Sequence, residues 1–163
     1  MKTLLLVRHA KSSWDDVNQT DFERPLNDRG KKDAPVMAER LKKKGIRPDL
    51  FVSSPAKRAY STAKLFAKEL NIDDKDIHLE EQLYHPEEKN ISKIISRLPG
   101  YAETVIVFSH NPGITYFANM LTSTRLDHMP TAAVFAIKVN SNQWSDFESA
   151  AKEFLFFDYP KAV

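Results

Sequence analysis

Two histidines of this sequence stand at the ends of apolar stretches, and an arginine precedes one of them. Arg8 and His9 close the stretch of residues 3–7, and His110 follows residues 104–109. Short apolar stretches of this kind are typical of strands buried on both faces, and ligands bind beyond the carboxyl ends of parallel strands. We therefore expect both imidazoles and the guanidinium in one crevice, where an imidazole can act as a nucleophile or carry a proton. Either histidine alone could simply end a strand.

A further arginine, Arg58, is expected at the same edge. It follows the apolar stretch of residues 50–53, and the serine and Pro55 between them are suited to a helix start. Arg58 then lies in the first helical turn, where the helix dipole disfavours a cation unless an anion binds nearby. Asn111 and Pro112 repeat this pattern, as helix cap and first helical residue. Helix N-termini bind anions, so the pattern predicts a phosphate pocket holding a nucleophile, although Arg58 alone could be a surface residue paired with a carboxylate.

Length and composition exclude several classes of protein. A chain of 163 residues fits one domain, residues 1–163, with a sizeable core. The absence of cysteine excludes disulfides, thiolate metal sites and cysteine-dependent phosphatases. A formal charge of +2 does not indicate a nucleic-acid partner. Arg8 ends the first apolar stretch too early for a signal peptide, so we expect a cytoplasmic protein without a membrane segment.

The order of the apolar patterns predicts an α/β protein, because expected strands alternate with segments of helical spacing. The strands are residues 3–7, 50–53, 77–79, 104–109, 132–139 and 153–157, and the helices cover 34–41, 59–70 and 91–98, with a fourth after Gly113. This alternation favours a mostly parallel sheet with helices on both faces. An interior proline disrupts a helix, so Pro35 predicts that the first helix begins or restarts near Asp33. Residues 12–28 lack a period and are expected to form a loop at the site.

Three ordered motifs give the chain a resemblance to a known family. They are Leu6-Val7-Arg8-His9-Ala10, Ser53-Ser54-Pro55-Ala56-Lys57-Arg58 and Phe108-Ser109-His110-Asn111-Pro112-Gly113. They resemble the motifs of the histidine phosphatase superfamily, also called phosphoglycerate mutase-like. Lys11-Ser12-Ser13-Trp14 and Arg24-Pro25-Leu26 are similar to the SixA-type phosphohistidine phosphatase branch. The resemblance implies a three-layer α/β/α fold with a mostly parallel central sheet, a phosphohistidine intermediate, and no cofactor or metal.

The resemblance also implies roles for individual residues. His9 is similar to the family nucleophile, and Arg8, Arg58 and a protonated His110 are similar to the residues that bind the phosphoryl group. Arg24 resembles a further cation on the substrate side.

Two further residues are expected near the substrate. Glu81 lies about where many superfamily members carry an acid that protonates the leaving group, although no glycine follows it here. Otherwise Glu81 is one of two adjacent solvated carboxylates. Asn111, beside His110, is a candidate substrate-binding residue.

The sequence therefore predicts a metal-independent phosphatase that acts through His9, with protein phosphohistidine as the expected substrate. Small phosphate esters, or phosphoserine and phosphothreonine proteins, are the alternative substrates. A mutase is less favoured, because the chain has little length for a lid that excludes water. From another class, the same pocket could bind a phosphorylated partner without turnover. A histidine-ligated metallohydrolase is disfavoured by the absence of closely spaced ligand pairs.

Overall fold

The computed structural model describes residues 1–162 and contains a six-stranded sheet. The strands, in the spatial order β3-β2-β4-β1-β5-β6, are Ile77–Leu79, Leu50–Ser53, Thr104–Ser109, Lys2–Arg8, Val134–Val139 and Lys152–Asp158. The first four strands of the chain run parallel, whereas β5 is antiparallel to β1, and β6 is antiparallel to β5. The expected α/β fold with a mostly parallel sheet is confirmed.

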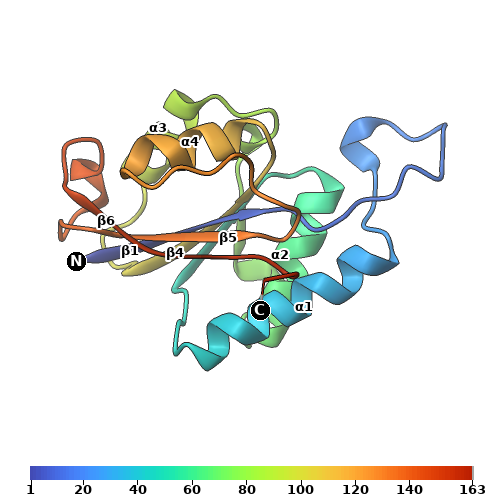
Figure 1. Ribbon diagram of the computed structural model, residues 1–163, viewed down its shortest axis with the longest axis horizontal. Coiled ribbons are helices and arrows are strands. Elements are labelled where there is room, and N and C mark those ends of the chain that lie inside the picture. Colours follow the sequence, from blue (N-terminus) through green and yellow to red (C-terminus); the bar gives the residue numbers. More distant parts are fainter. Residues whose placement is uncertain (163) are drawn as a thin grey trace.

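Helices cover both faces of this sheet and complete three layers (Figure 1). They are α1 (Asp28–Lys43), α2 (Lys57–Glu69), α3 (Glu88–Ser96) and α4 (Gly113–Leu121). Successive side chains of a strand point to opposite faces, and β1 shows the result. Leu4 and Leu6 pack in one core with residues of α3 and α4, while Leu5 and Val7 pack in a second core with α1 and α2.

The register between β1 and β4 positions the two histidines. These parallel neighbours pair Arg8 with Ser109, so His9 and His110 leave the sheet side by side at its carboxyl edge. The backbone N–H of His9 donates to the Ser109 carbonyl at 3.1 Å. On the other side of β4, Ser53 ends β2 opposite Phe108, and the segment leading into α2 starts from the same edge. The sheet topology thus gathers the three sequence motifs.

The first helix differs from the expectation, because α1 begins at Asp28 and runs through Pro35. The Asn27 side chain accepts a hydrogen bond from the Gly30 amide at 2.9 Å and caps the helix. Proline removes the bond to the carbonyl four residues earlier, but that residue, Lys31, is exposed, so water can replace the donor. The cap and the continuous buried face of α1 outweigh the missing bond.

The two caps expected near the site are also different. Ser54 precedes α2 and accepts from the Ala56 amide at 3.2 Å, and Ala56 occupies the cap position without a side-chain hydrogen bond. Pro55 therefore lies before the helix. Asn111 does not cap α4 either: Pro112 is at the cap position, and the Asn111 amide donates to the Met129 carbonyl at 3.0 Å. Ser54 thus makes a short-range contact in front of the helix, and Asn111 is held by a tertiary contact that no local pattern specifies.

The segment between β1 and α1 forms the expected loop at the site. It extends beyond the carboxyl end of β1 (Figure 1, blue) and contains the short helix η1, Asp21–Glu23. An isolated bridge between Ser12 and Leu26 closes its base. Of the helices in residues 1–162, none has the length and apolar character needed to cross a membrane.

Candidate active site

A cavity of about 390 Å³ opens at the carboxyl edge of the sheet. Six of the seven residues that the sequence singles out line this cavity: Arg8, His9, Arg24, Arg58, His110 and Asn111. The lining does not include Glu81, which lies exposed in the short helix η3, Glu81–Leu83. Its role as an acid therefore remains a prediction from the resemblance.

The His9 imidazole is held in one tautomer. Its Nδ1 lies 2.7 Å from the Ala10 carbonyl oxygen. A carbonyl only accepts, so Nδ1 carries the proton and Nε2 keeps a free electron pair. Arg58 Nε donates to this Nε2 at 3.4 Å. Burial, with the charges of Arg58 and Arg8, lowers the pKa of His9 to about 3 despite the Ala10 hydrogen bond. His9 is thus neutral at neutral pH, and its Nε2 is oriented as the nucleophile predicted from the sequence would require.

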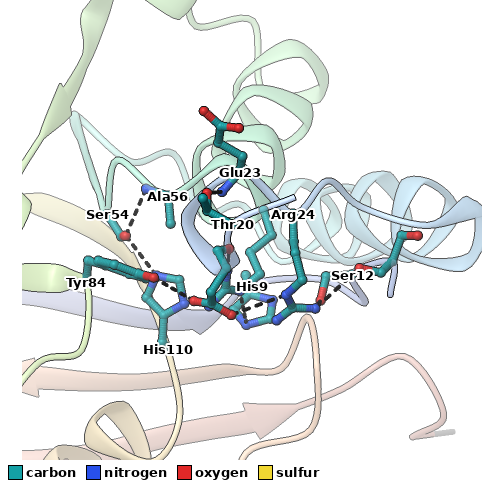
Figure 2. Close-up of polar contacts among 12 residues, drawn as sticks. His9, Ser12, Thr20, Glu23, Arg24, Ser54, Ala56, Tyr84 and His110 are labelled. Carbon is teal, nitrogen blue, oxygen red and sulfur yellow. Dashed lines mark hydrogen bonds and ion pairs between the residues drawn. The ribbon is translucent and has the colours of Figure 1, made fainter. Parts of the chain in front are cut away.

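His110 lies against His9, with 5.1 Å between the ring centroids. Figure 2 shows the two rings and the contact of His110 Nε2 with Ser54 Oγ, which is 2.7 Å long. Burial, with the charges of His9 and Arg58, lowers the pKa of His110 to about 2. The free site therefore holds His110 neutral, unlike the protonated form that the resemblance implies. A bound anion would shift its pKa upward.

Two buried nitrogens at this cavity have no hydrogen-bond partner within residues 1–162. They are His110 Nδ1 and Arg8 Nε. Buried polar atoms are usually paired, and an unpaired one calls for an explanation such as an absent ligand. If Ser54 Oγ donates to His110 Nε2, then Nδ1 is a donor, as Arg8 Nε always is. Two unpaired donors beside a nucleophile match the needs of a phosphoryl group.

Asp21 is a residue of the cavity that the sequence analysis missed. Its carboxylate accepts from Arg24 Nε at 3.2 Å, Arg58 Nη2 at 3.1 Å and the Tyr84 hydroxyl at 2.6 Å. Burial by itself would raise the pKa of Asp21, but the Tyr84 hydrogen bond and the Arg58 charge outweigh burial and lower the pKa to about 2. Among the lining residues of this cavity, Asp21 is the only carboxylate. It is ionised at neutral pH and cannot serve as a proton donor there.

Arg24 stands at the mouth of the cavity. Its guanidinium donates to Ser12 Oγ at 2.7 Å and lies 3.5 Å from the centroid of the exposed Trp14 ring. Arg24 also forms a salt bridge with Asp21. Arg24 is therefore held as a fixed cation in the cavity lining, and its role toward a substrate remains a prediction. The three-residue spacing from Asp21 to Arg24 is the signal from which this pair could have been found.

The loop after β3 contributes aromatic residues instead of the expected acid. His85 lines the cavity, and the Tyr84 ring stands edge-on to His110 at 5.4 Å. Burial of Leu83 in the core turns the next residues toward the site and leaves Glu81 outside. Among residues 1–162, no three His, Asp or Glu side chains are grouped so that they could hold a metal ion.

Comparison with known proteins identifies relatives over most of the chain. The profile of the histidine phosphatase superfamily (branch 1) matches residues 4–88. An uncharacterized chloroplastic protein of Arabidopsis thaliana is 29% identical over 154 residues, which cover 89% of this chain and 70% of the relative. Phosphoserine phosphatase 1 of Hydrogenobacter thermophilus is 39% identical over 75 residues, 45% of this chain and 35% of that enzyme. The chain thus spans about a third of the latter's length.

Solved structures share the fold. A protein of Agrobacterium tumefaciens described as a phosphohistidine phosphatase SixA superposes with a TM-score of 0.83 at 22% identity, covering 98% of both chains. The protein histidine phosphatase SixA in complex with tungstate gives a TM-score of 0.83 at 22% identity, over 97% of each chain. At this identity the likeness establishes a common fold, which is the three-layer arrangement that the sequence motifs imply.

Proposed function

The chain belongs to branch 1 of the histidine phosphatase superfamily, and we propose that this phosphatase hydrolyses phosphohistidine in proteins through a phosphohistidine intermediate on His9. The observation that carries the choice of substrate is that Asp21, the only carboxylate in the cavity lining within the described residues, accepts hydrogen bonds from Arg24, Arg58 and Tyr84, which favour its ionised form. Structural similarity to SixA proteins supports the same choice.

In the first step, the Nε2 electron pair of His9 attacks phosphorus. A bond forms between Nε2 and phosphorus, and the bond from phosphorus to the substrate nitrogen breaks. Arg8 and Arg58 neutralise the phosphoryl oxygens, which guanidiniums can do without a metal ion. His110 is neutral in the free site, and it gains a proton when the phosphoryl anion offsets the surrounding positive charge. Water then attacks phosphorus, the bond between His9 Nε2 and phosphorus breaks, and its electron pair returns to a neutral His9. The protons of the water stay on the released inorganic phosphate or pass to solvent.

The leaving group explains why phosphohistidine suits this cavity. An alkoxide must be protonated as it departs, and a positioned acid contributes roughly 10²- to 10⁴-fold to such a step. Ionised Asp21 cannot supply that proton. A substrate imidazole that already carries a proton on its other nitrogen leaves as a neutral ring. A carboxylate has about four acceptor positions, so Asp21 keeps one for that N–H beside its bonds from Arg24, Arg58 and Tyr84.

Hydrolysis of phosphate esters is the second candidate function. The imidazole of His85 lines the same cavity and can carry a proton to an alkoxide. The similarity to a phosphoserine phosphatase favours the same activity. Phosphohistidine hydrolysis would depend on Asp21, whereas ester hydrolysis would depend on His85. Single substitutions at these two residues therefore distinguish the two candidate functions.

The test compares a phosphohistidine peptide, a phosphoserine peptide and an alkyl phosphate, all with excess chelator. Wild-type protein should prefer phosphohistidine, and rapid quenching should trap acid-labile, base-stable phosphate on the protein. His9→Ala should lose both label and turnover. Asp21→Asn should slow phosphohistidine hydrolysis more than ester hydrolysis, while His85→Gln should leave phosphohistidine hydrolysis nearly unchanged.

Other outcomes would identify the alternatives. An ester preference that His85→Gln removes would establish the ester phosphatase. Tight binding of phosphopeptides without turnover would indicate a recognition module. Label that persists in His9→Ala would refute the intermediate.

A further inference from the structure

A second cavity, of about 350 Å³, adjoins the candidate active site. The two cavities share Arg8, Lys11 and Thr131 in their linings. The rest of the second cavity is built by the first turns of α1, the segment before β5 and the segment after β6, including Arg29 and Lys161. One extended ligand could therefore occupy both cavities across their common wall.

The second cavity is strongly cationic. Its lining within the described residues contains two arginines and two lysines against a single carboxylate, Asp33. Asp33 is already paired with Arg29, at 3.4 Å. The Lys11 ammonium makes no hydrogen bond or ion pair within residues 1–162, and Arg8 Nε is buried without a partner. Positive charge thus remains uncompensated along the wall that joins the two cavities.

The position of Arg29 adds to this argument. It is the second residue of α1, where the helix dipole disfavours a cation and favours an anion. A bound anion would offset both the dipole and the neighbouring cations. Asp21, which repels anions, lines the first cavity but not the second. Both linings are cationic, but the second lacks the Asp21 carboxylate, so a substrate with a negative charge beside its phosphoryl group would place that charge on the second side and bind in a defined orientation.

We propose that the second cavity is a subsite for an acidic side chain of the substrate protein, close to the phosphorylated residue. The proposal rests on the function proposed above, because it requires a phosphorylated protein in the first cavity. Its carboxylate would lie among Lys11, Arg29 and Lys161, while the phosphoryl group contacts Arg8 from the other side. Pro130 and Tyr159 also line this cavity and offer apolar surface to the methylene groups of such a side chain.

The test uses three phosphohistidine peptides that differ only in the residues flanking the phosphohistidine, which are glutamate, glutamine or lysine. Wild-type kcat/KM should be roughly 3- to 10-fold higher for the glutamate than for the glutamine peptide, the range for one or two partly exposed ion pairs, and the ratio should fall with added salt. Arg29→Gln should reduce the ratio. Arg29→Glu should reverse it in favour of the lysine peptide, which a merely structural role of Arg29 would not do.

Arg47→Gln is the matched control, because Arg47 is exposed and follows the opposite end of α1. It should keep the wild-type ratio. Equal rates for the glutamate and glutamine peptides in wild type, or a ratio that Arg29→Glu does not change, would overturn the subsite. A preference confined to small phosphorylated carboxylates would also overturn it and assign the cavity to a small molecule. Turnover of the glutamine peptide tests the proposed phosphatase separately, because that peptide does not use the subsite.

Discussion

Acid should destabilise this protein through the two buried histidines of the site. His9 and His110 are 6% and 3% exposed, and the folded protein lowers their pKa values from 6.5 to about 3 and about 2. Below pH 6.5 the unfolded chain binds protons at both positions, whereas the folded protein does not. The free energy of unfolding must therefore fall as the pH drops below 6.5.

The magnitude follows from linkage. Each histidine removes about 1.4 kcal/mol per pH unit, so at pH 5 each has removed about 2 kcal/mol and the pair about 4 kcal/mol. This loss requires only that both folded pKa values lie well below 5. It is a large part of the typical stability of roughly 5–15 kcal/mol. For a chain of this size it should lower the melting temperature on the order of 10 °C.

Urea unfolding between pH 8 and pH 5 measures this slope. His9→Gln and His110→Gln should each remove about half of the decrease, and His78→Gln, at an exposed position on β3, should leave it unchanged. Inorganic phosphate should flatten the slope, because a bound anion favours protonated His110. A decrease that persists in the doubly substituted protein would show that the two histidines do not cause it.

Three further substitutions or conditions test other parts of the structure. Arg58→Ala should lower kcat on the order of 10²- to 10³-fold, the scale for losing one preorganised electrostatic contact, as steady-state kinetics will show. Chelators should leave activity intact, and vanadate, which mimics a phosphoryl group, should inhibit competitively; restoration of a chelated enzyme by zinc would contradict this. Gly30→Ala places a methyl group against the Lys11 backbone and should lower the unfolding free energy by roughly 1–3 kcal/mol, whereas wild-type stability in denaturant titrations would refute that contact.

The sheet edge and its cationic residues could be predicted from the sequence because each of these residues directly follows the end of a strand or the start of a helix. Apolar stretches fixed β1, β2 and β4, and parallel strands bring their carboxyl ends together. One cavity therefore contains Arg8, His9, Arg58 and His110. This grouping could be predicted without knowledge of the loop conformations.

The remaining site residues could not be found in this way because tertiary contacts place them. Asp21 lies in the aperiodic loop before α1 and reaches the cavity through Arg58 and Tyr84, which are distant in sequence. Glu81 was expected from its position in the chain, but the burial of Leu83 decides which residues of that segment face inward. The predicted helix start near Asp33 relied only on the local effect of Pro35. The Asn27 cap and the buried face of the helix instead determine that α1 begins at Asp28.

The low pKa values and the proposed binding of a phosphoryl group have one physical cause. Burial and Arg58 oppose a further positive charge on either imidazole, and Arg8 adds to this at His9, so both rings remain neutral in the free site. A phosphoryl anion meets the same positive field with the opposite sign. Its entry would pair the open donors of Arg8 and His110 and remove the penalty for protonating His110. In the proposed mechanism, the field that keeps the resting site deprotonated is therefore the one that stabilises charge on the phosphoryl oxygens during transfer, and ionised Asp21 would restrict that stabilisation to leaving groups that need no proton from the enzyme.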